Sequence, residues 1–232
     1  MILDVESISV SYGKTQIIND LSIKCSDDEI ISILGRNGMG KTTLLKCIMG
    51  LLPTDNGQIH FKNEDVTSLE PHERARMGMT LVPQGRDIFP ELTVKENLRM
   101  GQFDTGDGQI DFEEVFSYFP ILEERLEQKG GTLSGGQQQM LAIARGLMTN
   151  PNLILLDEPS EGVQPSIVKD IAGILPQIHQ EQGIPIIIVE QNIDLAFSVA
   201  SRGYIIENGT IVAQGSTEEF RDSTIIQEKI GV

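Results

Sequence analysis

The chain has 232 residues, of which 39% are hydrophobic and 22% are charged, as expected for a globular protein with a sizeable core. Asp and Glu outnumber Lys and Arg by 34 to 18, and the net charge of −16 makes nucleic acids and anionic membrane surfaces poor partners. The two cysteines fit neither a disulfide framework nor a metal-ligand spacing, which indicates a reducing compartment.

No segment approaches the roughly 18 consecutive apolar residues of a membrane-spanning helix. The longest apolar runs, Ile30–Leu34 and Ile184–Val189, are short and rich in β-branched residues, so they predict buried strands. The first ten residues lack the basic and apolar regions of a signal peptide. We therefore expect any role at a membrane to depend on a partner protein.

Alternating apolar and polar residues predict two half-buried strands within the first 25 positions. Strand Ile30–Leu34 then runs into a Gly-rich turn and an apolar-periodic helix, Lys41–Met49. The next elements predicted in chain order are strand Gln58–Lys62, helix Pro71–Met77 and strand Met79–Val82.

Between residues 87 and 149 amphipathic helical spacing dominates, with a Gly/Asp-rich loop predicted at Gly101–Gln109. Strands return after Pro151, and two of them form a hairpin turned at Asn208-Gly209. The predicted elements of this last part are strand Leu153–Leu156, helix Ser166–Gln180, and strands Ile184–Val189, Arg202–Glu207 and Thr210–Ala213. Buried strands alternating with helices predict an α/β fold with a mainly parallel, helix-covered sheet.

The first chemical motif, Gly35–Thr42, fits the pattern GxxxxGK[ST] and lies between a predicted strand and a predicted helix. Its glycines let successive backbone N–H groups point at phosphate oxygens, and the helix that follows adds its positive end. Lys41 is placed to reach the β- and γ-phosphates and Thr42 to hold Mg²⁺. The sequence therefore predicts the nucleotide-binding site of a P-loop NTPase, with Mg²⁺ as its metal ion.

The second motif is the apolar strand Leu153–Leu156, which ends in the adjacent carboxylates Asp157 and Glu158. At this edge Asp157 can hold Mg²⁺ through water, and Glu158 can polarise the water that attacks the γ-phosphate. On its own this pattern also describes an acidic turn after a strand.

The third motif, Leu133–Gln139, begins a helix with Ser134 as its expected N-cap and Gly135 and Gly136 in its first turn. It predicts a second helix end able to bind phosphate, far from Lys41 in sequence. As structure alone it is a capped helix.

Together these motifs resemble the nucleotide-binding subunits of ABC transporters, whose signature is the segment Leu133–Gln137, and the resemblance covers essentially the whole chain. It implies one ABC ATPase domain over residues 1–232, with antiparallel N-terminal strands, a catalytic core at 1–86 and 150–232, and a helical subdomain at 87–149. It also implies that Tyr12 stacks on adenine and that Gln84 senses Mg²⁺ and the membrane domains.

The site residues that follow from the motifs and the resemblance fall into three groups. The predicted catalytic residues are Lys41, Gln84, Glu158 and Gln191. The predicted metal-binding residues are Thr42, Gln84 and Asp157. The predicted nucleotide-binding residues are Tyr12, Gly35, Arg36, Asn37, Gly38, Met39, Gly40, Lys41, Thr42, Thr43, Ser134, Gly135, Gly136 and Gln137.

The segment Val82–Pro90 is similar to the corresponding segment in one branch of the family, the ATPases of transporters for branched-chain amino acids and related small amides. Within it, four segments are most similar to the ATP-binding subunit of urea transporters: Gly35–Gly40, Pro71–Arg76, Ser134–Gln139 and Glu161–Ile167. The resemblance thus implies an importer of urea or short amides, with branched-chain or hydrophobic amino acids as the alternative. Two positions depart from the wider family, since Gln191 replaces its switch histidine and Gln164 replaces an aspartate.

The resemblance further implies a second ATPase subunit paired head to tail, identical or related, together with permease subunits and, indirectly, a solute-binding protein. The expected location is the cytoplasmic face of the inner (plasma) membrane, as a peripheral subunit. Two rivals remain: a non-transport ABC ATPase acting on nucleic acid or ribosomes, and a regulatory subunit that binds ATP without hydrolysing it. The acidic charge opposes the first, and the intact Lys41, Asp157 and Glu158 oppose the second.

Overall fold

The computed structural model describes residues 1–102, 112–221, 226 and 229–230. Most of the predicted loop Gly101–Gln109 therefore lies outside the described residues. The strands are β1 (Leu3–Tyr12), β2 (Thr15–Cys25), β3 (Ile30–Leu34), β4 (Asn56–Phe61), β5 (Glu64–Asp65), β6 (Met79–Val82), β7 (Leu153–Asp157), β8 (Ile186–Glu190), β9 (Arg202–Glu207) and β10 (Thr210–Ser216). The helices are α1 (Lys41–Ile48), α2 (Pro71–Arg76), α3 (Val94–Arg99), α4 (Phe112–Tyr118), α5 (Pro120–Glu123), α6 (Gly135–Leu147), α7 (Pro165–Gln182), α8 (Ile193–Val199) and α9 (Thr217–Arg221), with a 3-10 turn at Gly130–Thr132.

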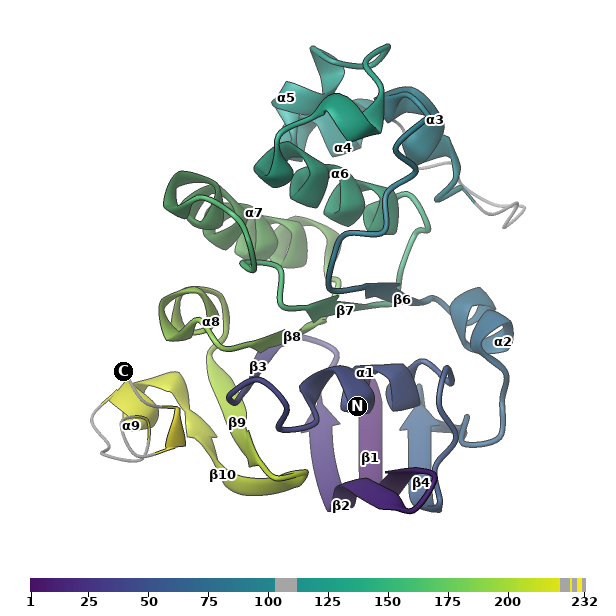
Figure 1. Ribbon diagram of the computed structural model, residues 1–232, viewed down its shortest axis with the longest axis vertical. Helices are drawn as coiled ribbons and strands as arrows, with labels where there is room; N and C mark the ends of the chain where they lie inside the picture. The colour runs from purple at the N-terminus through teal and green to yellow at the C-terminus, as the bar shows by residue number, and fades with distance from the viewer. Residues whose placement is uncertain (103–111, 222–225, 227–228, 231–232) are drawn as a thin grey trace.

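The central sheet has the order β10-β9-β3-β8-β7-β6, and every neighbouring pair except β9–β10 is parallel. Strands β3, β7 and β8 are buried along their whole length, so their continuous apolar runs match a sheet that is covered on both faces. Alternate residues of these strands join two different core clusters, one on the side of α1 and one on the side of α6, α7 and α8 (Figure 1). The predicted parallel, helix-covered sheet is confirmed.

A second sheet, antiparallel and in the order β2-β1-β4-β5, packs beside α1 at the lower end of the view in Figure 1. Its inward side chains are completely buried in the cluster that also contains residues of α1 and β3. The antiparallel N-terminal strands predicted for the fold are confirmed by this sheet.

The helices α3, α4, α5 and α6 form a layer at the opposite end of the molecule (Figure 1). Helix α6 begins with a capping box, in which the Ser134 hydroxyl accepts a hydrogen bond from the Gln137 N–H at 3.3 Å and the Gln137 side chain accepts one from the Ser134 N–H at 3.0 Å. Its apolar face is buried against this layer and against strands β6 and β7. The amphipathic spacing between residues 87 and 149 therefore corresponds to these helices.

Several element boundaries and one helix differ from the sequence prediction. Strand β8 begins at Ile186 instead of Ile184, because Pro185 has no N–H to donate to the ladder. Helix α7 is longer than predicted at both ends, starting with Pro165 in its first turn and ending at the left-handed Gly183. Helix α8 is absent from the sequence prediction because it is only seven residues long. Its N-cap is Asn192, whose side-chain oxygen accepts a hydrogen bond from the Leu195 N–H.

The turn of the β9–β10 hairpin contacts the loop before α1. The Gly209 N–H donates to the Met39 carbonyl at 3.0 Å, and the Gly209 carbonyl accepts from the Asn19 N–H at 3.0 Å. A Cβ at Gly209 would lie 1.9 Å from the carbonyl oxygen of Ile17, so only glycine fits here. The hairpin thus holds the Gly-rich loop against β2.

Arg74 of α2 forms hydrogen bonds with the C-terminal end of α1. Its side chain is 2% exposed and donates to the carbonyls of Cys47, Ile48, Thr67 and Leu69 at 2.7–3.1 Å. Burial lowers the pKa of this guanidinium. Arg74 therefore satisfies carbonyls at the C-terminus of α1 that have no partner within the helix.

Replacing Arg74 with Met is expected to lower the free energy of unfolding by about 3 kcal/mol or more, because several buried carbonyls lose their donor. Chemical denaturation gives the value. Arg76→Met on the exposed side of the same helix is the matched control and should stay within about 0.5 kcal/mol of the parent. Equal losses in the two variants would contradict this role of Arg74.

Candidate functional site

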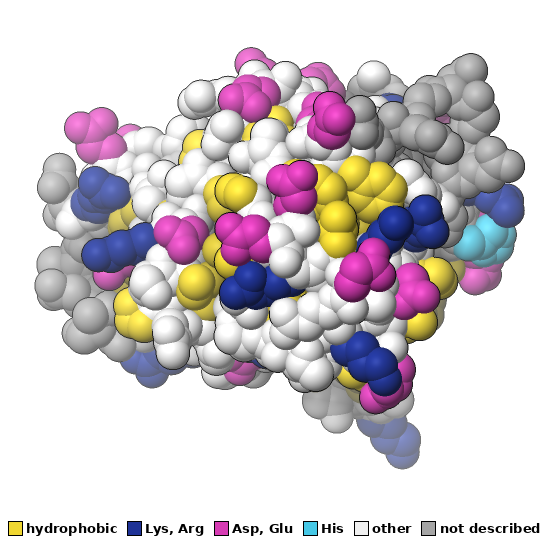
Figure 2. Space-filling model, turned by 90° about the horizontal axis from the view of Figure 1, so that it is seen from above, with side chains coloured by type: hydrophobic (Ala, Val, Ile, Leu, Met, Phe, Trp, Pro, Cys, Tyr) yellow, Lys and Arg dark blue, Asp and Glu magenta, His cyan; other side chains and the backbone are white. Residues whose placement is uncertain are grey.

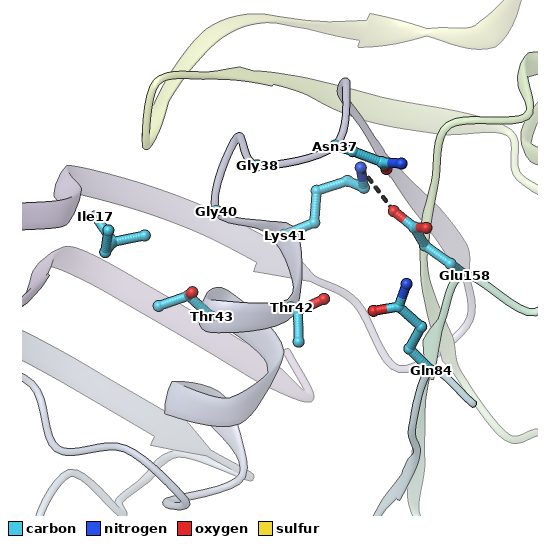
Figure 3. A pocket seen from close by; sticks show the side chains of 9 residues that line it. All are labelled: Ile17, Asn37, Gly38, Gly40, Lys41, Thr42, Thr43, Gln84 and Glu158. Atoms are coloured by element: carbon cyan, nitrogen blue, oxygen red, sulfur yellow. Dashed lines mark ion pairs between the residues drawn. The ribbon is translucent and has the colours of Figure 1, made fainter. Parts of the chain in front are cut away.

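The Gly-rich loop opens onto a cavity of about 440 Å³ at the carboxyl ends of the parallel strands. It is lined by Ile17, Asn37, Gly38, Gly40, Lys41, Thr42, Thr43, Gln84 and Glu158 (Figure 3). Eight of the nine belong to the predicted nucleotide-binding, catalytic or metal-binding residues, and Ile17 is the exception. The structure thus gathers residues from distant parts of the chain around the phosphate loop.

All of the lining residues except Ile17 are therefore site residues that the sequence predicts. The cavity does not include Tyr12, Asp157 or Gln191, whose positions are described below.

Two glycines shape the phosphate loop. Gly40, the residue before α1, has a φ of 106°, which disfavours any side chain. A Cβ at Gly35 would lie 2.7 Å from the carbonyl oxygen of Ile206, so the start of the loop lies directly against β9. No side chain caps α1, so its first N–H groups are free to bind phosphate oxygens.

Lys41 and Glu158 form the central ion pair of the cavity. The Lys41 Nζ lies 2.8 Å from Glu158 Oε1 (Figure 3), and both side chains are less than 10% exposed. Lys41 Nζ also donates to the carbonyls of Gly35 at 2.6 Å and Arg36 at 3.1 Å. Phosphate oxygens that bind Lys41 would compete with these partners, and Glu158 would then be released toward the cavity.

Thr42 and Asp157 supply the oxygens expected to bind a metal ion. The Thr42 hydroxyl donates to Asp157 Oδ1 at 3.1 Å, and Asp157 is only 4% exposed. Burial raises the pKa of the Asp157 carboxyl, while the hydrogen bond from Thr42 acts in the opposite direction. Among the described residues no three His, Cys, Asp or Glu side chains form a metal cluster. A hydroxyl beside one carboxylate fits Mg²⁺ that takes its other ligands from phosphate and water.

The backbone of Glu158 is held in an unusual conformation directly after β7. Its φ is 47°, a left-handed value that costs about 1–2 kcal/mol for a residue with a Cβ. Its N–H donates to the Val189 carbonyl at 3.0 Å. The turn therefore directs the Glu158 side chain into the cavity instead of continuing the strand.

Gln84 follows β6 and is held by a partner that the motifs did not reveal. Its side-chain Nε2 donates to Glu161 Oε2 at 2.6 Å, three residues beyond Glu158. Nearby, Arg86 donates to the Gln138 side chain and to the Gly162 carbonyl, both at 3.2 Å. The loop after β6 is thus linked to the loop after β7 and to helix α6, and nothing local in the sequence indicates these links.

The third motif lies apart from the cavity. Ser134, Gly135, Gly136 and Gln137 start helix α6 in the helical layer, while the cavity surrounds the start of α1 (Figure 1). Within one chain the structure does not bring the two predicted phosphate-binding helix ends together. The Ser134 hydroxyl accepts its capping bond from Gln137 and keeps its own hydrogen for another acceptor.

Two further predicted residues lie outside the cavity lining. Tyr12, at the end of β1, is 49% exposed, so its ring is accessible to a planar base. Gln191 is exposed immediately after β8, the strand that pairs with β7 in the sheet. Both positions are compatible with the predicted roles of Tyr12 and Gln191.

The surface over the helical layer carries charges of both signs. In Figure 2 the Lys and Arg side chains are interspersed with Asp and Glu, and hydrophobic side chains are exposed among them. The exposed large hydrophobic residues of the described chain include Phe89 at 42% and Met100 at 54%. None of the described helices has the length and hydropathy required to cross a membrane.

Comparison with known proteins places these motifs in a family. The family model described as ABC transporter matches residues 18–161. The branched-chain amino acid transport ATP-binding protein BraG of Pseudomonas aeruginosa is 43% identical over 90% of this chain and 91% of its own length. The lipopolysaccharide export ATP-binding protein LptB of Haemophilus influenzae is 35% identical over 94% of this chain and 92% of its own.

A solved structure supports the same assignment. The ADP conformation of an ATP-binding cassette of an ABC transporter is 31% identical, covers 97% of both chains and superposes with a TM-score of 0.84. It shares the mixed parallel sheet, the antiparallel N-terminal sheet and the helical subdomain. The chain therefore belongs to the ABC transporter family, as one of its ATP-binding subunits and an ATPase coupled to transport.

Proposed function

We propose that the chain hydrolyses ATP to drive an importer of branched-chain amino acids. The observation that carries this proposal is the 43% identity to a branched-chain amino acid transport subunit over nine-tenths of the chain. Urea, the solute that the motifs predict first, is not supported by the relatives described above, and the amino-acid alternative fits them better.

The chemistry rests on the residues of the cavity. Lys41 and the N–H groups of the phosphate loop bind the β- and γ-phosphates, and Mg²⁺ bound by Thr42 and Asp157 offsets their charge. Glu158, once released from Lys41, accepts the proton of the attacking water. Gln84 and Gln191 each offer a side-chain amide to orient that water or the γ-phosphate.

Tyr12 and a second subunit complete the proposed nucleotide site. The exposed ring of Tyr12 stacks on the adenine base. The segment Ser134–Gln137 of a head-to-tail partner supplies the other phosphate-binding helix end, which explains why one chain keeps its two such ends apart. The partner is a second copy of this chain or a related ATPase.

The remaining partners are permease subunits and, through them, a solute-binding protein. The surface near Gln84 and Phe89 is proposed to contact the permease, since the Phe89 side chain is exposed. The centroid of its ring lies 5.2 Å from the Arg145 guanidinium carbon. We infer from this that the chain works as a peripheral subunit at the cytoplasmic face of the inner (plasma) membrane. The net charge of −16 continues to oppose a nucleic-acid partner.

The solute is tested in the native host by replacing the chromosomal gene with the Glu158→Gln variant and measuring uptake of radiolabelled leucine, isoleucine and valine. Uptake of these amino acids is expected to fall strongly, because the variant lacks the proton acceptor for hydrolysis. Urea uptake is the matched control and should not change.

Two outcomes would contradict the proposed solute. Lost urea uptake with normal leucine uptake would restore the urea hypothesis. A defect in surface lipopolysaccharide with both uptakes intact would instead indicate export, the process for which the 35%-identical relative is named.

A further inference from the structure

Glu190, the last residue of β8, is a buried acidic residue with no role in the motifs. It is 1% exposed, and no ion pair of the described residues includes it. Burial raises the pKa of its carboxyl, and the hydrogen bonds from Ser160 and Asn192 oppose that shift. A buried carboxylate without a cationic partner needs hydrogen-bond donors to offset the free energy lost on leaving water.

Four donors surround the Glu190 carboxylate, and they come from two different loops. Ser160, in the loop after β7, donates its N–H to Oε1 and its hydroxyl to Oε2, both at 2.9 Å. Gln191 and Asn192, in the loop after β8, donate their N–H groups to Oε2 at 3.1 Å. One side chain therefore joins the loop that carries Glu158 to the loop that carries Gln191.

The register of the sheet explains why these loops meet at Glu190. Strands β7 and β8 are parallel neighbours, with Asp157 opposite Val189. The chain segments that follow them leave the sheet side by side. The backbone carbonyl of Glu190 also accepts the Gly35 N–H at 3.3 Å, which links the start of the phosphate loop to the same residue.

We propose that Glu190 is a positioning residue, which holds the loop of Glu158 and the loop of Gln191 in the relative placement that hydrolysis requires. The inference rests on the proposed roles of those two residues. It differs from a purely structural role in one respect: the loss of Glu190 slows turnover at saturating ATP, beyond any loss of folded protein.

Glu190→Gln tests this with a minimal change of shape. Because Oε2 accepts three bonds, the amide oxygen is expected to occupy its place, and the new NH₂ then faces the Ser160 N–H. The bond from the Ser160 N–H, in the Glu158 loop, is broken, while the three bonds at the oxygen, from the Ser160 hydroxyl, Gln191 and Asn192, remain. We expect kcat to fall about tenfold or more, as a misplaced group causes, while KM for ATP stays within about twofold.

Glu29→Gln is the matched control, since Glu29 is a half-buried carboxylate that also accepts several hydrogen bonds, including those from Arg202 Nε and Nη2 at 2.8 and 2.7 Å. It lies at the opposite end of β3 and is expected to lower thermal stability without changing kcat. Ser160→Ala removes one of the four bonds and should lower kcat by about two- to threefold with the fold intact. It keeps the inference testable if Glu190→Gln does not fold.

The outcomes separate the two proposals. If kcat of Glu190→Gln and Ser160→Ala matches the wild-type value, or falls only as far as Glu29→Gln falls, the positioning role is wrong. If Glu158→Gln itself keeps wild-type turnover, the proposed catalytic role of Glu158 is wrong, whatever Glu190 does. A fall in kcat for Glu190→Gln beyond that of Glu29→Gln, at unchanged KM, supports the positioning role.

Discussion

Glu158→Gln is expected to lower the ATPase rate of the purified chain by about a hundredfold or more, the usual contribution of a general base. The amide cannot accept a proton at neutral pH, and it keeps the size of the side chain that lines the cavity. Affinity for ATP is expected to be equal or higher, because Lys41 no longer has a carboxylate at 2.8 Å to exchange for phosphate. Phosphate release and isothermal titration calorimetry measure the two quantities.

Glu64→Gln on the exposed strand β5 is the matched control and should behave as the parent. With slow hydrolysis, Mg-ATP should also hold Glu158→Gln chains together as dimers, which light scattering detects. A variant that stays monomeric would indicate that the partner is a related chain. Turnover within a few-fold of the parent would show that another group accepts the proton.

Lys41→Met has two large expected effects. Affinity for Mg-ATP should fall about ten- to a hundredfold, because a charged donor to phosphate is lost. The free energy of unfolding should also fall by about 3–5 kcal/mol, since Glu158 is left buried without its cation. Calorimetric titration and chemical denaturation measure these effects separately.

The double variant Lys41→Met/Glu158→Gln separates binding from folding. Replacing both charges by neutral groups of similar shape is expected to restore most of the stability. Nucleotide affinity should remain low, because no cation faces the phosphates. If affinity recovers together with stability, the weak binding of Lys41→Met reflects misfolding, and Lys41 is not the phosphate ligand.

Local pattern was sufficient to predict most of the fold. The apolar β-branched run Ile30–Leu34 could only be a buried strand, and the structure begins and ends it at those residues. The Gly-rich turn after it and the carboxylates after Leu156 follow from parallel strands, whose carboxyl ends share one edge of the sheet. For this reason Lys41, Thr42 and Glu158 could be assigned to one site before their distances were known.

The contacts that hold the site could not be predicted in the same way. The bonds Gln84–Glu161 and Ser160–Glu190 join residues 77 and 30 positions apart. They depend on which strands are neighbours, and the sequence pattern does not give the strand order. Glu190 did carry one signal, because it ends an apolar strand as Asp157 does, but a carboxylate at a strand end is common in turns.

The hairpin turn at Asn208-Gly209 makes the order of synthesis matter. The phosphate loop leaves the ribosome early, yet its Met39 carbonyl and the Asn19 N–H both bond to Gly209, which is synthesised much later. Strand β3, which leads into that loop, likewise pairs with β8 and β9, and both are synthesised long after it. A nascent chain released before this hairpin would contain the whole GxxxxGK[ST] motif but not the support that shapes it. Released chains that end before this hairpin should thus be retained on immobilised ATP far less than the full chain.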